Sequence, residues 1–351
     1  MSSNSKYDRS LKEKKRRTLK RLEKQLPDYC IPFLDEKELV SQINTVISYT
    51  YDLITFFSFL YEKNPMVKVD EIRDIPPEIL ENLTFEDINE YQRYLSFNDG
   101  EFSHMNEDKG IARRMAALRG FFEFACTHGY LKNNPTVGAA KRKKTPKKDI
   151  IRLSPDEVKA YLDTIEGSDL GSDRQKKFLQ KTSLRDFAIL TLLLNTGIRV
   201  SECVGLDVKD INFRENSFTV LRKGGNTAIL YFNDDVSAAL MDYIENERSL
   251  YDPDGDIEAL FLSLRRRRIS VRAVQNMVKK FGQAAVPDKH ITPHKMRSTY
   301  GTALYRQSGD IRLVADVLGH KDINTTAKHY AAMEDEHRRQ AAKIILYEDD
   351  E

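Results

Sequence analysis

Residues 183–202 of the chain read SLRDFAILTLLLNTGIRVSE. Apolar residues lie on most sides of positions 183–196, which is typical of a helix buried in a hydrophobic core. Thr196 and Gly197 follow that helix, so we expect the side chain of Arg199 to leave a rigid element. On its own, an arginine in this place is more often a surface residue than a ligand of an anion. The stretch therefore predicts the centre of a folded domain, with a cation at the end of its buried helix.

The residues on either side of this stretch predict a small sheet among helices. Alternating apolar positions at 211–213, 217–221 and 227–232 flank a Gly-Gly turn, which is typical of a β-hairpin. Upstream, residues 154–157 (SPDE) have the residue types of a helix start. From residue 153 onward, the fold class is therefore mainly α with a small antiparallel β-sheet (α+β). Further helices are predicted at 234–249, 270–284, 294–307, 310–318, 322–331 and 334–347.

The N-terminal half of the chain shows helical periodicity. Apolar residues recur at three- and four-residue steps over 6–26, 36–63 and 111–128. Proline, glycine and a basic run interrupt this periodicity between 133 and 152, which is typical of a linker. We therefore expect a basic N-terminal helix at 1–35, an all-helical domain at 36–135, a basic linker at 136–152, a mixed domain at 153–333 and a tail helix at 334–351.

Positive charge is clustered although its sum is small. The 351 residues include 56 Lys and Arg against 54 Asp and Glu, a net charge of +2. Ten Lys or Arg stand against three acids over residues 6–24, and eight against one over 132–152. Such clusters suit a polyanion such as DNA, although charge runs are also commonly solvated surface. The candidate DNA-binding residues are Lys109, Arg113 and Arg114 near the start of the third helix, and Lys141, Arg142, Lys143 and Lys144 in the linker.

Several classes of protein are excluded by what the sequence lacks. No apolar run reaches the ~18–20 residues that cross a bilayer, so we expect no membrane association. The N-terminus lacks an apolar signal core, which favours a cytoplasmic protein. Cys30, Cys126 and Cys203 lie far apart without a CxxC pair, so neither a disulfide scaffold nor a thiolate zinc site is expected. With no GxxxxGK[ST] loop and no recognisable acidic metal cluster, we expect neither a metal nor ATP as cofactor.

Five short motifs carry groups suited to phosphodiester chemistry. Two guanidinium groups, Arg199 and Arg297, can clamp the non-bridging oxygens of a phosphate and keep their charge at any physiological pH. His294, on the same predicted helix face as Arg297, and His320, after a helix stop, can exchange protons near neutral pH. Each motif alone is weak, and their order over about 130 residues makes them informative. They are TGIRVSE (196–202), RKGG (222–225), HKMR (294–297), LGH (318–320) and Tyr330.

In this order and spacing the motifs resemble the tyrosine recombinase (phage integrase) family. The N-terminal helix, the basic linker and the RKGG sequence look most like the single-protein Xer recombinases of firmicutes. The resemblance covers the chain from about residue 36 and implies an all-helical core-binding domain followed by a catalytic domain. Tyr330 stands ten residues after His320, where many relatives have nine. The catalytic set that the resemblance implies is Arg199, Lys223, His294, Arg297, His320 and the nucleophile Tyr330, with Glu202 supporting Arg199 by an ion pair.

The resemblance also implies an activity and partners. DNA would be cut and rejoined through a 3′-phosphotyrosyl intermediate and a Holliday junction, without a metal or ATP. A homotetramer would act on two double-stranded recombination sites, with a DNA translocase or another accessory factor as a further partner. Only about 35 residues precede the core-binding domain, which favours Xer-type chromosome dimer resolution. The tail helix at 334–351 would dock on a neighbouring subunit or on its own domain.

Three alternatives stay open at this point. The same chemistry could serve an integrase or transposase of a mobile element. A type IB topoisomerase would relax DNA as a monomer without choosing a site, and a non-catalytic DNA-binding protein would keep only the fold. The intact set of catalytic residue types favours an enzyme over the non-catalytic protein.

Overall fold

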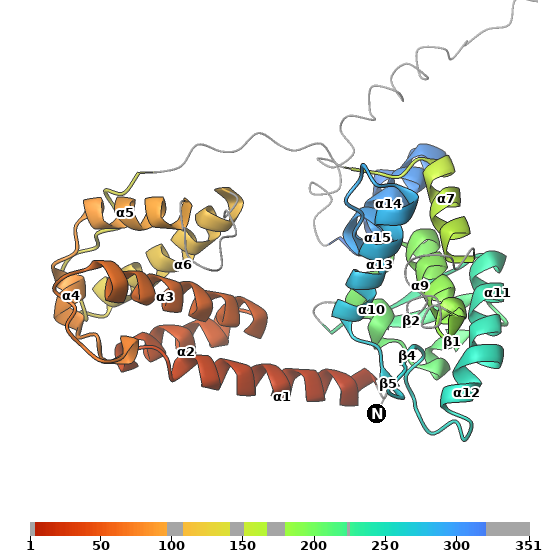
Figure 1. The fold of residues 1–351 in the computed structure, drawn as a ribbon, viewed down its shortest axis with the longest axis horizontal. Coiled ribbons are helices and arrows are strands. Elements are labelled where there is room, and N and C mark those ends of the chain that lie inside the picture. The colour runs from red at the N-terminus through yellow and green to blue at the C-terminus, as the bar shows by residue number, and fades with distance from the viewer. Residues whose placement is uncertain (1–3, 97–107, 141–150, 167–179, 223–224, 321–351) are drawn as a thin grey trace, which may run out of the picture. The chain divides into compact units, whose positions relative to one another are not determined.

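Figure 1 shows a computed structural model of the protein, which describes residues 4–96, 108–140, 151–166, 180–222 and 225–320. The chain divides into two compact units, one holding Lys6–Lys147 and the other holding Lys148–Glu351. Each unit has a hydrophobic core of its own. The predicted fold class is confirmed, because the units are mainly helical and the antiparallel sheets lie in the second unit.

The described part of the first unit is built from helices packed around aromatic rings. Phe33, Phe57 and Phe121 are at most 1% exposed and lie at its centre. Leu19 and Leu26 belong to the same buried cluster, so the helix that the sequence analysis set apart at 1–35 packs into this core. The helices are α1 (Asn4–Glu23), α2 (Ile31–Val40), α3 (Ile43–Lys63), α4 (Pro77–Glu81), α5 (Phe85–Ser96) and α6 (Asp108–Thr127).

The pattern at 36–63 is not one helix, contrary to the prediction. α2 ends at Val40, and the extended backbone of Ser41 and Gln42 separates it from α3. Leu39, one of the apolar residues that recur in this pattern, is 86% exposed. The prediction was wrong because the apolar spacing of the two helices continues across the break, and periodicity alone does not detect so short an interruption.

The first described elements of the second unit are three helices and a sheet. The strands β1 (Ile211–Asn212), β2 (Ser217–Leu221) and β3 (Thr227–Tyr231) form an antiparallel sheet in the order β1-β2-β3. Thr219 of β2 lies opposite Ile229 of β3. The predicted buried helix and the predicted hairpin are both confirmed. The three helices are α7 (Pro155–Glu166), α9 (Ser183–Thr196) and α10 (Val200–Gly205).

The rest of the second unit contains one hairpin that the sequence analysis missed. The strands β4 (Leu262–Ser263) and β5 (Arg267–Arg268) pair in antiparallel fashion, but strands of two residues carry no alternating pattern. The helical stretch predicted at 234–249 is interrupted by a π-helical turn, Tyr243–Arg248. The predicted helices at 322–331 and 334–347 lie outside the described residues. The described helices here are α11 (Asp234–Asp242), α12 (Ser249–Tyr251), α13 (Val271–Ala285), α14 (Pro293–Ser308) and α15 (Ile311–Leu318).

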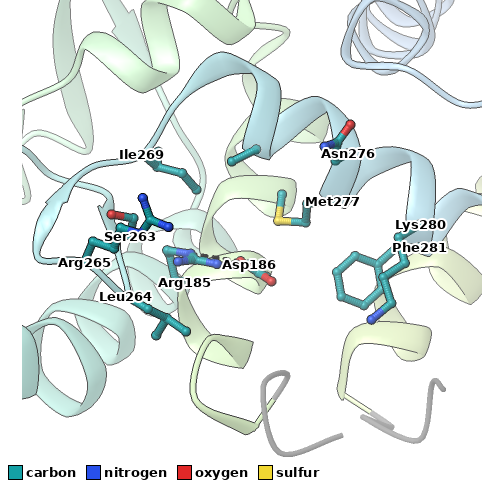
Figure 2. Close-up of a pocket in the computed structure, with 11 residues that line it drawn as sticks. Arg185, Asp186, Ser263, Leu264, Arg265, Ile269, Asn276, Met277, Lys280 and Phe281 are labelled. Atoms are coloured by element: carbon teal, nitrogen blue, oxygen red, sulfur yellow. Dashed lines mark hydrogen bonds and ion pairs between the residues drawn. The ribbon is translucent and has the colours of Figure 1, made fainter. Parts of the chain in front are cut away.

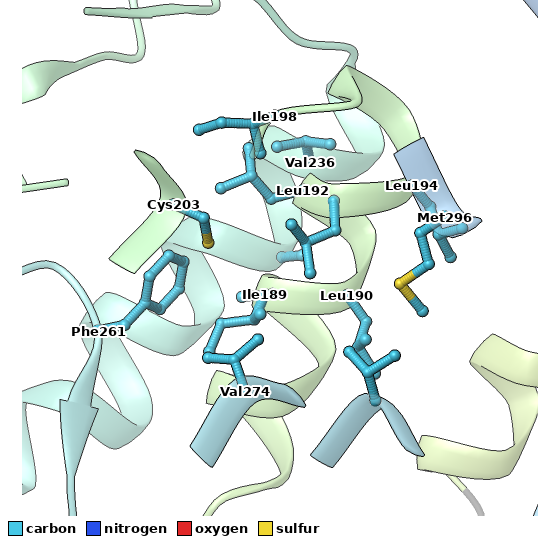
Figure 3. Close-up of a cluster of buried hydrophobic side chains, with 14 of the residues drawn as sticks. Ile189, Leu190, Leu192, Leu194, Ile198, Cys203, Val236, Phe261, Val274 and Met296 are labelled. Atoms are coloured by element: carbon cyan, nitrogen blue, oxygen red, sulfur yellow. The ribbon is translucent and has the colours of Figure 1, made fainter. Parts of the chain in front are cut away.

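α9 is the central element of the second unit. Figure 3 shows apolar side chains of α9 surrounded by side chains from other helices. Ile189 and Leu190 are fully buried and pack in one cluster with Val236 of α11, Val274 of α13 and Met296 of α14. Each such side chain contributes about 1.5–3 kcal/mol when it leaves water. The residues that follow α9 therefore start from a fixed position.

A buried carboxylate holds the start of α9. Glu247, in the π-helical turn, is 6% exposed and accepts hydrogen bonds from the backbone amides of Leu184 (3.0 Å) and Arg185 (3.3 Å). Burial raises the pKa of Glu247 from 4.5 to about 7, although the hydrogen bonds and the charge of Arg185 oppose this shift. The folded protein therefore retains a proton at Glu247 over a pH range in which the unfolded chain loses it.

We expect the free energy of unfolding of the second unit to fall as the pH rises from about 4.5 to about 7. In this range the unfolded chain releases the proton that folded Glu247 keeps, so a higher pH favours unfolding. Glu247→Gln keeps an oxygen acceptor but does not titrate, and should flatten this part of the profile. Urea unfolding at a series of pH values measures the slope. Glu245→Gln, at an exposed position of the same turn, is the control. Equal slopes for the wild type and Glu247→Gln would contradict the expectation.

Candidate active site

Consecutive backbone carbonyls at the C-terminal end of α15 accept hydrogen bonds from three arginines. α15 ends at Leu318, and Gly319 closes it with a left-handed backbone at φ 61°. The last carbonyls of a helix lack α-helical partners and carry partial negative charge, so guanidinium groups are well suited to cap them. Arg222 donates to the carbonyls of Asp316 and Val317. Arg297 donates to the carbonyl of Leu318, and Arg199 donates to that of Gly319.

Arg199 stands between the end of α9 and the start of α10. Its guanidinium donates to the carbonyl of Gly319 (2.8 Å) and to the carboxylate of Glu202 (2.8 Å), so the predicted ion pair is present. The same carboxylate accepts the backbone amide of Arg199 (3.0 Å). Glu202 thus fixes both the main chain and the side chain of the arginine. The Arg199 side chain is 32% exposed, which leaves it accessible to an anion.

Arg297 joins the end of α9 to the end of α15. Its guanidinium donates to the carbonyl of Gly197 (2.5 Å) and to the carbonyl of Leu318. At 6% exposure this cation is buried, and its hydrogen bonds offset the loss of water around the charge. Arg199 and Arg297 therefore hold adjacent carbonyls. The structure brings together the two cations that the sequence analysis predicted for one phosphate.

The two candidate histidines occupy helix boundaries of the same unit. His320 follows Gly319 directly, and its backbone amide donates to the carbonyl of Ala315 (2.8 Å), which fixes its place in the turn. His294 lies in the first turn of α14 and is exposed, whereas Arg297 on the same helix is buried. The three-residue spacing thus places the two residues at different depths. His294 is at the solvent-exposed start of the helix.

Arg222 belongs to the same cluster, although the sequence analysis named only Lys223 from the RKGG motif. At the end of β2, its guanidinium donates to the carbonyls of Asp316 (2.8 Å) and Val317 (2.7 Å). A Cβ on Gly319 would lie 2.4 Å from the Nη1 atom of Arg222, so a larger residue would displace the guanidinium from this place, and the φ of 61° also favours glycine. The contact joins residues 94 positions apart, and no local pattern in the sequence marks it.

Gly197 provides the space in which α9, α14 and α15 meet. Its φ of 60° lies in the left-handed region, which a Cβ disfavours. A Cβ at Gly197 would also lie 2.6 Å from Cδ1 of Tyr300 and 2.9 Å from Cδ2 of Leu318. Tyr300 packs here, and burial raises the pKa of its phenol. The glycine of the TGIRVSE motif is therefore required by both backbone conformation and packing.

Some predicted residues lie outside the described part of the chain. These are the catalytic candidates Lys223 and Tyr330 and the linker residues Lys141, Arg142, Lys143 and Lys144. Lys109 lies in the first turn of α6. Their assignments stay predictions.

The other DNA-binding candidates of the first unit face a carboxylate of the protein itself. Arg113 donates to both carboxylate oxygens of Asp52, and Arg114 lies 3.8 Å from the same carboxylate. Asp52 is buried, and burial raises its pKa although the bond from Arg113 opposes this. The Arg113 side chain is still 49% exposed, so a phosphate would have to share it with Asp52.

The described residues also hold a cavity away from the arginine cluster. They contain no group of three or more His, Cys, Asp and Glu that could hold a metal, and no helix suited to crossing a bilayer. A cavity of about 400 Å³ lies beside the start of α9, as Figure 2 shows. Its lining includes the buried pair Arg185 and Asp186 together with Met277 and Phe281. None of the catalytic candidates that the structure describes lines it, so the cavity is separate from the arginine cluster.

The arginine cluster has the chemistry of an anion site. Guanidinium groups that are already oriented by fixed acceptors can stabilise charge that develops on phosphate oxygens, because little reorganisation is needed when the charge forms. Residues 151–337 of the chain match the family model described as the phage integrase family. The chain belongs to this family. The protein is therefore a tyrosine recombinase, a DNA strand-transferring enzyme, as the motifs predicted.

Curated relatives agree over most of the recombinase. It is 35% identical to the tyrosine recombinase XerC of Caldanaerobacter subterraneus subsp. tengcongensis over 312 aligned residues. The alignment covers 85% of this chain and 80% of the relative. It is 31% identical to the tyrosine recombinase XerD of Staphylococcus epidermidis over 287 aligned residues. This alignment covers 81% of this chain and 86% of the relative. The predicted activity, site-specific recombination by a tyrosine recombinase, is confirmed at the level of the family.

Solved structures share the fold of the recombinase. XerH bound to a palindromic difH substrate, in a post-cleavage complex, has a TM-score of 0.63 at 17% identity over 88% of this chain and 82% of that one. The Tn1549 transposon integrase in complex with transposon right end DNA has a TM-score of 0.61 at 20% identity over 89% of this chain and 99% of that one. At these identities the likeness concerns the fold.

We expect Gly197→Ala to lower the free energy of unfolding of the second unit by about 3 kcal/mol, from left-handed backbone strain together with crowding against Tyr300 and Leu318. Gly255→Ala is the matched control, since Gly255 has φ 73° and no described atom lies within 4 Å of its added Cβ. That variant should lose only the backbone part, about 1 kcal/mol. Chemical unfolding of both variants measures these free energies. Equal losses of stability in the two variants would show that crowding against Tyr300 and Leu318 adds nothing to the backbone strain.

Proposed function

We propose that this recombinase resolves chromosome dimers in the manner of Xer enzymes, as a homotetramer that acts on two double-stranded recombination sites. The observation that carries the proposal is the attachment of Arg199 and Arg297 to the adjacent carbonyls of Gly319 and Leu318, directly before His320. A phosphodiester held by these groups would have two cations and an imidazole around it. The proposed catalytic residues are Arg199, Lys223, His294, Arg297, His320 and Tyr330, with Glu202 in support.

The proposed cleavage step is an exchange of one phosphoester for another. The phenolic oxygen of Tyr330 forms a bond to phosphorus while the bond from phosphorus to the 5′ oxygen breaks. The phenol loses its proton, the departing 5′ oxygen gains one, and the products are a 3′-phosphotyrosine and a 5′ hydroxyl. A 5′ hydroxyl of the partner duplex then reverses the step. Because the covalent adduct keeps the ester bond, the exchange needs neither ATP nor a metal.

Each proposed residue has a separate role in this step. Arg199 and Arg297 stabilise the charge on the non-bridging oxygens. His320 hydrogen-bonds to one of these oxygens, and His294 assists proton transfer. Lys223 protonates the 5′ oxygen as it leaves.

Support for the Xer-type role comes from the curated relatives, XerC and XerD, which align with more than four-fifths of this chain. The proposed partners are duplex recombination sites, contacted in part by the basic linker residues, and a DNA translocase or another accessory factor. The role places the enzyme in the cytoplasm with the chromosome. We assign the tail at 334–351 to contacts between subunits.

Tyr330→Phe should abolish covalent attachment to DNA while binding of the target duplex stays within about twofold, because the substitution removes only the attacking oxygen. Suicide substrates that carry a nick near the cleavage site trap the adduct, and denaturing gels detect it. Tyr300→Phe, which alters a half-buried phenol beside Gly197, is the matched control and should still form the adduct. An adduct formed by Tyr330→Phe would refute the assignment of the nucleophile.

The biological role has a test of its own. Trapped covalent complexes formed on fragments of the host genome should yield one short chromosomal site when their DNA is sequenced. Recovery of the ends of a mobile element would contradict dimer resolution and support an integrase or transposase. Adducts spread without a common sequence would contradict site-specific recombination.

A further inference from the structure

The backbone of Arg222 closes the hairpin turn at the end of β2. Its amide donates to the carbonyl of Asn226 (2.8 Å), and its carbonyl accepts the amide of Gly225 (3.0 Å). The backbone of Arg222 is therefore bonded to Gly225 and Asn226 on the far side of the turn. Lys223 is the next residue in the chain, so its Cα is about 3.8 Å from that of Arg222.

The side chain of Arg222 attaches this turn to the end of α15. One guanidinium spans two successive carbonyls, those of Asp316 and Val317, at 2.8 and 2.7 Å. The planar fork of arginine can make both hydrogen bonds at a defined orientation, whereas the single ammonium of a lysine cannot reproduce it. The absence of a side chain on Gly319 lets the guanidinium lie against the backbone there.

The same short run of carbonyls holds the two catalytic arginines. Arg297 binds the carbonyl of Leu318, and Arg199 binds that of Gly319, so three segments distant in sequence share one set of acceptors. Because a helix end in a packed domain is rigid, groups attached to it keep fixed distances from one another. Arg222, at the start of the hairpin turn, is thereby attached to the same helix end as Arg199 and Arg297.

We propose that Arg222 is a positioning residue for the general acid, which holds Lys223 in register with Arg199, Arg297 and His320. The inference rests on the proposed function, in which Lys223 protonates the 5′ oxygen. Arg222 itself makes no contact with the substrate in this scheme. Both Nη atoms of its guanidinium donate to carbonyls of the protein, and its effect reaches the reaction only through the placement of Lys223.

The leaving group of the substrate provides a direct test. In normal DNA the bond from phosphorus to the 5′ oxygen breaks, and the alkoxide needs a proton. In a duplex with sulfur in place of that oxygen, the bond from phosphorus to sulfur breaks and a thiolate leaves. A thiol has a pKa of ~8.5, so it needs no general acid. A variant that has lost only the placement of Lys223 should therefore recover on the sulfur substrate.

We expect Arg222→Ala to slow single-turnover cleavage of the oxygen substrate by about 10²-fold, the size of effect that a misplaced catalytic group produces. Cleavage of the sulfur substrate should recover to within about threefold of the wild type. Arg222→Lys should resemble Arg222→Ala, because it keeps the charge but loses the fork. The target duplex is the one recovered by covalent trapping. Recovery on sulfur cannot come from an unfolded protein, so it separates positioning from loss of the fold.

Two controls make the outcome decisive. Arg214→Ala removes the same charge from an exposed position in the turn between β1 and β2 and should leave cleavage of both substrates unaffected. Lys223→Ala reports on the proposed function: if sulfur rescues it but not Arg222→Ala, the positioning role is overturned and the general acid stands. If sulfur rescues neither variant, the assignment of Lys223 fails and the inference fails with it. Full activity of Arg222→Lys on the oxygen substrate would also overturn the proposed fork.

Discussion

The carbonyl end of α15 is the interaction on which the rest of the site depends. An α-helix leaves its last carbonyls without internal partners, and here Arg222, Arg297 and Arg199 supply them. These hydrogen bonds satisfy the carbonyls at the end of the helix. They also hold the buried or half-buried guanidinium groups in a fixed orientation. Since the cations are oriented before any substrate arrives, little reorganisation opposes the stabilisation of a phosphate in the transition state.

The hydrophobic core fixes the other end of the arginine cluster, because it holds α9 in place. α9 is buried on nearly all sides, and it delivers Gly197 and Arg199 from a position that many side chains determine. The carbonyl of Gly197 accepts a hydrogen bond from Arg297. Because Gly197 has no side chain, Tyr300 and Leu318 can pack against its backbone. The end of α9 and the end of α15 are therefore joined by both apolar packing and a buried guanidinium. Neither anchor alone would fix the separation of the two arginines.

Such a design suits a reaction in which the covalent chemistry is simple and the geometry is demanding. An in-line exchange at phosphorus needs charge stabilisation and alignment more than it needs a cofactor. The groups proposed for it come from the ends of rigid elements: Arg199 before α10, Arg297 in α14 and His320 after α15. The chain continues from His320 towards Tyr330, so the turn that holds the cations also leads to the proposed nucleophile.

The sequence by itself determined the buried helix at 183–196, the hairpin of β2 and β3, the ion pair between Arg199 and Glu202 and, through the order of its motifs, the family. These features depend on local periodicity, on turn residues and on neighbours within a few positions. The tertiary structure alone decided that the pattern at 36–63 breaks at Ser41, because its spacing is the same in one helix or two. It alone showed the contacts of Arg222, whose acceptors lie more than ninety residues away. Hydrogen bonds of that kind are made when distant segments pack, and the sequence carries no periodic signal for them.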